Sequence, residues 1–238
     1  MKRFIISLIL VLASFLQVAE AQKAKSETTK SLTGYVKFYF ELNTNLQYPA
    51  ASEAKNTIGM SVSRVVLSQE GKVESVEIIN PLDKDIDYAV VAALKKTSLV
   101  WLLSDSSVSD RTFYIQIAFI LNLGPSDFFF KSAVPNKKMF VKPVAIYGFP
   151  ESPGMSQIPE QDFVLTADCN LEYQSGNYTK ALKIADELIR RYPYTKDLYQ
   201  LRILIAKKLF RNDIIQGDVL KMSNFAEGMS LDKLMSEE

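Results

Sequence analysis

The sequence predicts an α+β protein, in which an antiparallel sheet with two helices precedes a small all-α unit. Two runs rich in β-branched residues flank Gly71 at residues 59–67 and 73–79, as in a hairpin. A third such run occupies residues 112–121. From Asp162 onward the apolar spacing becomes helical. The two kinds of period follow one another along the chain, which predicts two structural units.

The first 31 residues carry the marks of an exported chain. Lys2 and Arg3 precede an almost wholly apolar run at 4–18, and Ala19-Glu20-Ala21 is a small-x-small cleavage pattern. The apolar run is shorter than the ~20 residues that a membrane-spanning helix needs. Residues 1–21 are therefore expected to be a cleaved signal peptide, and an uncleaved inner-membrane anchor is the alternative. A polar, Lys-rich leader follows at 22–31.

The expected order of the first domain, residues 32–123, is strand, helix, strand, strand, helix and strand. Residues 34–42 are rich in aromatic residues and alternate in the manner of a strand. The expected core side of that strand consists of Val36, Phe38, Phe40 and Leu42. Pro49 suits the first turn of a short helix that ends near Asn56.

The second half of this domain begins with the hairpin, in which Gly71 is expected to have a positive φ. Asn80-Pro81 ends its second strand, and residues 87–96 have the spacing of an amphipathic helix. Trp101 is expected in the core. The strand at 112–121 places Phe113, Ile115, Ile117 and Phe119 on one face.

A Pro-rich segment at 124–160 contains six of the nine prolines and is expected to be an extended connector without long helices. Helical patterns then fill 161–225, and a polar tail occupies 226–238. Cys169 falls among apolar helix positions, so we expect it to be buried packing rather than a reactive thiol.

Composition argues against most catalytic and cofactor-binding classes. The formal net charge of +1 gives no field that would attract nucleic acid. Histidine is absent, and with one cysteine the chain has neither the usual general base nor a zinc-ligand set. The aspartates at 83, 85 and 87 lack calcium-loop spacing and suit a helix start. We therefore expect no enzyme activity, no cofactor and no metal.

Residues 35–123 contain a set of features whose order resembles the C-terminal domain of the TonB family. The features are Tyr48-Pro49 before a short helix, Gly59 opening a strand, Gly71 in the hairpin and Trp101 after the second helix. Two features depart from the family pattern: Leu102 and Leu103 follow the tryptophan, and the hairpin turn lacks the common Asp.

The resemblance implies a non-catalytic module that pairs an exposed strand with an extended segment of a partner protein. A TonB-dependent outer-membrane receptor is the implied kind of partner. The candidate edge strand carries Phe113, Ile115 and Ile117. The alternative is a scaffold whose sheet edges are covered and whose helical unit makes the protein contacts. Ten leader residues reach only about 35 Å, too short for a standard energy transducer.

The helical unit resembles a tetratricopeptide repeat. Its signature is Gly176 at a tight turn, Tyr178 after it, Ala181 and Ala185 at close-packing positions, and Pro193 at the end of the helix. A second repeat over 197–222 is faint, and an unrelated helical hairpin is the alternative. Because solenoids normally need about three repeats, we expect these helices to pack on the rest of the protein. The expected function is protein binding in the periplasm of a Gram-negative bacterium, in support of envelope transport.

Overall fold

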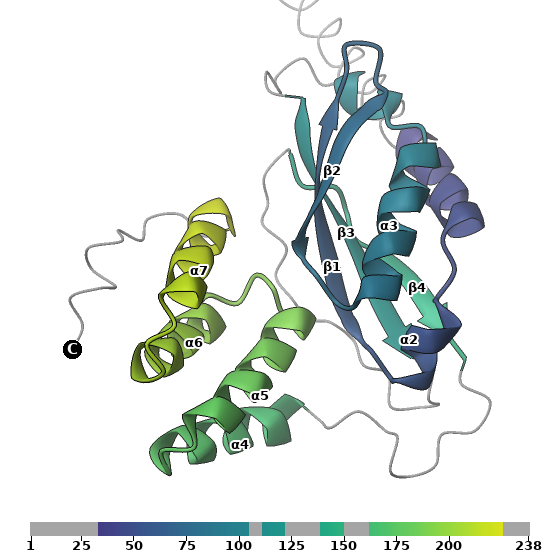
Figure 1. Cartoon of the computed structure of the whole chain (residues 1–238). Coiled ribbons are helices and arrows are strands. Elements are labelled where there is room, and N and C mark those ends of the chain that lie inside the picture. Colours follow the sequence, from purple (N-terminus) through teal and green to yellow (C-terminus); the bar gives the residue numbers. More distant parts are fainter. Residues whose placement is uncertain (1–32, 105–110, 122–138, 150–161, 226–238) are drawn as a thin grey trace, which may run out of the picture.

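The chain forms an α+β structure in which helices flank a four-stranded sheet (Figure 1). A computed structural model describes residues 33–104, 111–121, 139–149 and 162–225. The expected signal peptide and leader, and the polar tail, lie outside these ranges. The strands are β1 (Gly59–Leu67), β2 (Val73–Asn80), β3 (Thr112–Leu121) and β4 (Val144–Gly148). Their order across the sheet is β2-β1-β3-β4.

The sheet is mixed, where the sequence predicts an antiparallel one. β1 pairs antiparallel with β2 and with β3, as expected from the hairpin and the third run. β4 then adds to β3 in parallel, with Ile117 opposite Val144 and Leu121 opposite Gly148. This strand comes from the Pro-rich connector, whose extended conformation was expected. A five-residue strand between prolines carries too little periodicity to be predicted as a fourth member of the sheet.

Residues 33–45 form a helix, so the strand predicted at 34–42 is wrong. Aromatic residues alternate there, but Tyr35, Phe38 and Leu42 also share one side of a helix. Phe38 and Leu42 are fully buried against the sheet, whereas Val36 and Phe40 are exposed. Tertiary packing selects the helix, because a short run of this composition is compatible with either period.

Two further helices belong to the sheet domain. α2 (Ala50–Ala54) begins after Pro49, which occupies its N-cap position. α3 (Lys84–Lys96) begins three residues earlier than predicted, because the Asp83 carboxylate caps it by accepting from the backbone N–H groups of Asp85 and Ile86. A 3₁₀ turn (Val100–Ser104) then leads toward β3.

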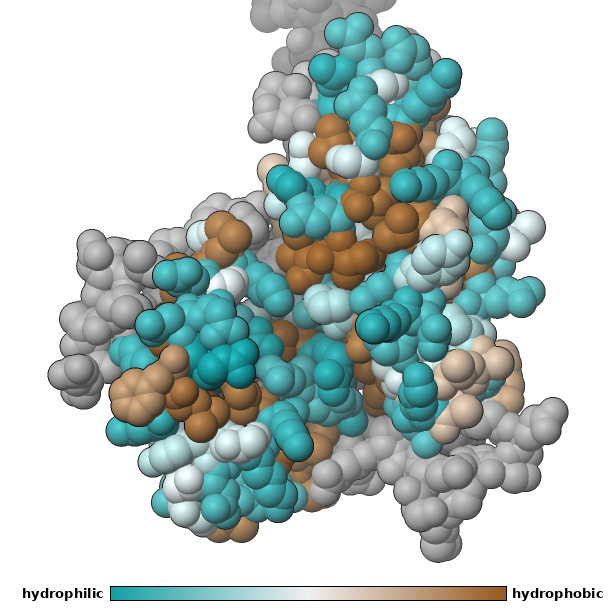
Figure 2. Space-filling model, viewed as in Figure 1, coloured by the Kyte–Doolittle hydropathy of each residue, from teal (hydrophilic) through white to brown (hydrophobic). Residues whose placement is uncertain are grey.

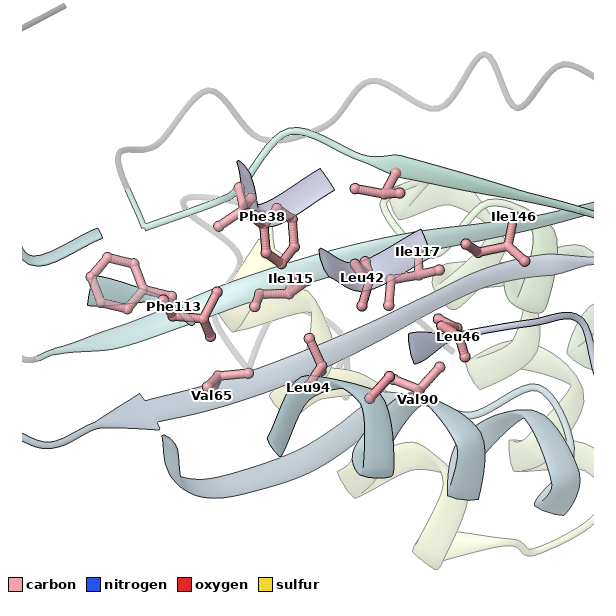
Figure 3. Packing of buried hydrophobic residues seen from close by; sticks show 14 of the residues in the cluster. Phe38, Leu42, Leu46, Val65, Val90, Leu94, Phe113, Ile115, Ile117 and Ile146 are labelled. Carbon is pink, nitrogen blue, oxygen red and sulfur yellow. The ribbon is translucent and has the colours of Figure 1, made fainter. Parts of the chain in front are cut away.

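The main core lies between one face of the sheet and the helices at 33–45 and α3. Figure 3 shows Phe38 and Leu42 from one helix, and Val90 and Leu94 from the other, directed toward β-strand side chains. The strand contributions include Val65, Phe113, Ile115, Ile117 and Ile146, all buried. Both helices are needed to cover this face.

The C-terminal unit consists of four helices of similar length, and each packs against the next: α4 (Asp162–Gln174), α5 (Tyr178–Arg191), α6 (Lys196–Lys208) and α7 (Asn212–Phe225). The starts of α4 and α6, at 162 and 196, are 34 residues apart, as are those of α5 and α7 at 178 and 212. That offset equals the tetratricopeptide period of 34 residues. The second helix pair, faint in the sequence, therefore follows the first in regular register.

The helical unit packs against β1, on the face of the sheet opposite the main core, as expected from its small number of helices. The Asn80 side chain donates to Met60 O at 2.8 Å and to Arg190 O, at the end of α5, at 3.4 Å. The Tyr194 ring meets Phe140 edge-on, with centroids 6.0 Å apart. Met60, Val62 and Tyr114 form the small apolar cluster at this contact.

Candidate functional site at the sheet edge

β3 is an inner strand, so the predicted binding edge is wrong. Phe113, Ile115 and Ile117 lie at the centre of the core with at most 1% of their surface exposed. β1 pairs with one side of β3, and β4 pairs with part of the other. Farther along β3, Tyr114 exchanges backbone hydrogen bonds with Met139 and Val141. The connector therefore covers the strand that was predicted from the sequence to be a free edge.

β2 is the longer of the two outer strands. The side of β2 that each backbone N–H and C=O group faces follows from the alternation of residues along the strands. The Leu67 N–H donates to Arg111 O, on the β3 side of β1. Neighbouring residues of a strand point to opposite sides, so Arg64 and Val66 point toward β2. Their partners there are Glu77 and Ser75. Ser75 and Glu77 therefore point toward β1. Val76 and Ile78 alternate with them, so their backbone N–H and C=O groups point away from β1.

Within the described ranges no strand pairs with this outer edge of β2, and apolar side chains lie along it. Val73, Val76 and Ile78 are only partly buried and pack against the main core. Figure 2 shows a hydrophobic patch over β2, alongside α3. The opposite face of the edge is polar, because Glu77 pairs with Arg64 across the strands at 2.8 Å. An added strand would thus meet an apolar side and a polar side.

The other outer strand, β4, offers much less. It has only five residues. Just before it, Pro143 O accepts from the Tyr35 hydroxyl at 3.3 Å. Just after it, the Phe149 N–H donates to the Glu53 carboxylate. Both ends of β4 are therefore tied to neighbouring helices, and β2 is the better edge for pairing.

The signature residues of the first domain support the fold around this edge. The Tyr48 ring meets Phe119 edge-on at 5.3 Å, and its hydroxyl donates to Thr57 O. Burial, with Glu53 and Asp83 nearby, raises the Tyr48 pKa above its ordinary value. Trp101 is half-buried, with its ring centroid about 6 Å from the Phe38 ring.

The two signature glycines have backbone conformations that favour glycine. Gly71 has φ of 78°, as the hairpin predicts. Gly59 has φ of 152°, and a Cβ there would lie 2.7 Å from Arg190 O. Gly59 therefore permits the close approach between β1 and the helical unit, a role that the sequence did not indicate.

The acidic residues near α3 serve the helix start, as predicted. Burial would raise the Asp83 pKa, but hydrogen bonds from the Ile86 N–H and the Ser52 hydroxyl outweigh it and lower that pKa. Burial raises the pKa of Asp87, which accepts from the Leu82 N–H. Among the described residues, no group of three or more His, Cys, Asp or Glu is arranged to hold a metal ion.

The repeat signature lies at the interface between α4 and α5, except for Pro193, which follows α5 and contacts α6. Gly176 takes φ of 79° in the turn. Tyr178 meets Tyr173 of α4 edge-on at 5.6 Å. Ala181 and Ala185 are fully buried, as the close approach of two helices requires. Pro193 O accepts the Tyr199 hydroxyl at 2.6 Å. Cys169 is buried at the same interface, where burial raises its pKa, in agreement with the predicted packing role.

The helical unit contains a buried ion network that the sequence did not predict. Arg202 of α6 donates to Asp186 of α5 at 2.6 Å and to Asp218 of α7 at 2.8 Å. The Asp218 side chain is only 2% exposed. These charges stand 16 residues apart in the sequence, so local patterns cannot pair them. The network ties three helices together.

Buried polar side chains in the sheet were also missed. Ser61, Ser63 and Gln116 are fully buried, and the Ser61 Oγ, the Ser63 Oγ and the Gln116 Oε1 atoms have no hydrogen-bond partner among the described residues. They are structural costs of the sheet.

Comparison with known proteins leaves the chain without an assigned relative. No family model matches it, and neither a curated protein nor a solved structure matches. In the part of the chain that the structure describes, none of the helices combines the length and the apolar character needed to cross a bilayer.

Proposed function

We propose that this chain is a non-catalytic protein-binding module of the Gram-negative cell envelope, which pairs an extended segment of a partner protein with the open edge of β2. The observation that carries the proposal is the outward direction of the Val76 and Ile78 backbone groups. Strand addition satisfies such groups and draws its affinity from main-chain hydrogen bonds.

The side chains beside the edge support the same function. A partner strand would place alternate residues against Val76 and Ile78, and the residues between them beside Glu77. Alternating apolar and polar residues, with a basic residue near Glu74 and Glu77, make the best-fitting segment. Both of these glutamates are exposed.

The N-terminal sequence supports an envelope location, with export through a cleaved signal peptide at 1–21. The TonB-like order of motifs favours an outer-membrane receptor segment as the partner and envelope transport as the process. The edge proposed is β2, since β3 is paired on both sides.

Proline at position 76 tests the edge directly. Proline has no N–H, and it is tolerated in edge strands where that group faces solvent. Val76→Pro should reduce affinity for receptor-derived extended peptides at least tenfold in a peptide-panel binding assay. Val76→Thr is the matched control, because it keeps the donor and a β-branched side chain, and it should bind within about twofold of the wild type.

Hydrogen exchange gives a second readout. The amides of Val76 and Ile78 should become protected in the complex, while the β3 amides change little. Peptide binding that survives Val76→Pro, or protection confined to the helical unit, refutes pairing at β2.

A scaffold that makes its contacts through the helical unit is the second candidate function. The observation that favours it is the regular 34-residue offset of two helix pairs, an architecture that presents extended binding surfaces. Protection of α4–α7 amides by a partner, with unchanged β2 amides, would select this function.

A further inference from the structure

β2 contains an extra residue near each of its ends. Its register with β1 shifts at Ile79 and at Glu74, because the residues on either side of each of them oppose adjacent residues of β1. Such an extra residue is a β-bulge, which disrupts the ladder locally and bends the strand. The pairing of β1 with β3 runs from Gly59 to Val66 without a shift. The irregularity therefore belongs to the outer strand and not to the sheet as a whole.

The two bulges interrupt the alternation of the β2 backbone. The residues that face β1 are 72, 75, 77 and 80: the first accepts from the Ser68 N–H at 2.8 Å through its carbonyl oxygen, and the others oppose residues of β1 that point toward β2. They are three, two and three positions apart, whereas a regular strand keeps a spacing of two. Val76 and Ile78 are thus the outward-facing pair at regular spacing, and residues 75–78 form the pairing window for an added strand.

The side chains of this window differ between the two faces of the sheet. Val76 and Ile78 lie on the side of the main core. Ser75 and Glu77 lie on the other side, because strand residues alternate between faces. The two hydrogen bonds that Arg64 donates to Glu77 both go to Oε2. The Glu77 side chain is 55% exposed, so its Oε1 atom can accept from a basic side chain of a partner.

An antiparallel segment beside this window has a defined best sequence. Its residues opposite Ile78 and Val76 share their apolar side, and the residue between them lies beside Glu77. Its last residue lies beside Ser75, which suits a small polar side chain. From its N-terminus, the best segment therefore reads apolar, basic, apolar, polar.

We propose that β2 selects a four-residue segment with this pattern, and that the bulges at Glu74 and Ile79 keep longer strands from pairing there. A second copy of the chain would present such a longer strand, because its own β2 has eight residues. Bulges are a means by which proteins protect sheet edges from pairing with one another. This inference rests on the pairing function proposed above and adds the class and the length of the segment.

The first test measures the binding of capped, fluorescein-labelled synthetic peptides to the purified protein by fluorescence polarisation. A peptide with a valine-lysine-valine-serine core should bind about fivefold tighter than one with glutamate in place of lysine. Lengthening the lysine peptide from about six to about ten residues with alternating threonine and valine should change its affinity by less than about twofold, because the added residues meet no regular partner. A gain of about tenfold, which two further main-chain hydrogen bonds would supply, overturns the four-residue window.

Glu77→Lys tests the charge preference. The glutamate peptide should now bind about fivefold tighter than the lysine peptide. Glu70→Lys is the matched control, because Glu70 is an exposed glutamate in the hairpin turn outside the window, and it should keep the wild-type preference. The same preference in both variants overturns recognition by Glu77.

Deletion of Glu74 tests the bulge itself. It restores a two-residue spacing, so the longer peptide should gain about fivefold in affinity and the protein should self-associate in sedimentation velocity. A folded deletion variant that stays monomeric and gains no affinity overturns the role of the bulge. If the deletion prevents folding, the peptide length series on the wild type decides the question.

Val76→Pro separates this inference from the function on which it rests. Peptide binding that this variant loses, but that is indifferent to charge and rises with length, overturns the selective window and leaves pairing at β2 intact. Peptide binding that survives Val76→Pro refutes pairing at β2, and the window with it.

Discussion

The sheet domain and the helical unit bury polar groups in opposite ways. In the helical unit, Arg202 is enclosed by two carboxylates from neighbouring helices. In the sheet, Ser61 and Ser63 are fully buried with hydroxyl groups that have no partner in the described part of the chain. The sheet's own ion pair, Arg64 with Glu77, is exposed to solvent.

This difference shows where each unit is vulnerable. Removing one partner from a buried ion pair leaves a charge with neither water nor a counter-ion. Removing an unpaired hydroxyl from the sheet instead relieves a cost. The helical unit should therefore be sensitive to charge loss, and the sheet should gain from loss of polarity.

The largest expected effect comes from Arg202→Met. Asp218 would remain buried without its main counter-ion, so the free energy of unfolding should fall by about 3–5 kcal/mol. Denaturant titration followed by far-UV circular dichroism measures the loss. Arg64→Met is the matched control on the sheet, where an exposed pair contributes less than ~1 kcal/mol. Similar losses in the two variants would remove the contrast between the units.

A change at the contact between the units should have an intermediate effect. Gly59→Ala places a Cβ against Arg190 O at a φ that alanine disfavours, so stability should fall by about 2 kcal/mol. Gly217→Ala in α7 is the control, because nothing lies near its Cβ, and it should stabilise by roughly 0.5–1 kcal/mol. Thermal unfolding of both variants checks this. An unaffected Gly59→Ala protein would mean that the helical unit moves away from β1 at little cost.

The smallest expected effect is a gain. Ser63→Ala removes a buried hydroxyl that has no partner among the described residues, and the free energy of unfolding should rise by about 1 kcal/mol. Ser52→Ala is the control, since the equally buried Ser52 hydroxyl donates to Asp83 at 2.9 Å. That variant should lose about 1 kcal/mol. A loss at both positions would show that the Ser63 hydroxyl is satisfied in solution, by water for example.

Strong local signals were predicted correctly. Gly71 between two β-rich runs gave the hairpin, and the run at 112–121 gave β3 with its observed bounds. Helical spacing from Asp162 predicted the C-terminal unit, including the turn at Gly176. These elements have periods or turn residues that depend only on neighbours along the chain.

The candidate site could not be predicted in the same way. Whether β3 or β2 has an open side depends on where residues 139–148 pair, and that pairing joins segments far apart in sequence. Residues 34–42 satisfied two periods at once, and their contact with the sheet selected the helix. The ion network around Arg202 likewise arises from helices stacked side by side.

The sequence by itself determined the α+β class, the hairpin, β3 and the helical character of the C-terminal unit, because apolar period and turn residues act locally. Tertiary structure alone decided that β3 is covered, that β2 has no strand beyond it among the described residues, and that Val36, Tyr39 and Phe40 face outward. The physical reason is that an edge or an exposed face is defined by what does not pack against it, and packing joins residues that are distant in the chain.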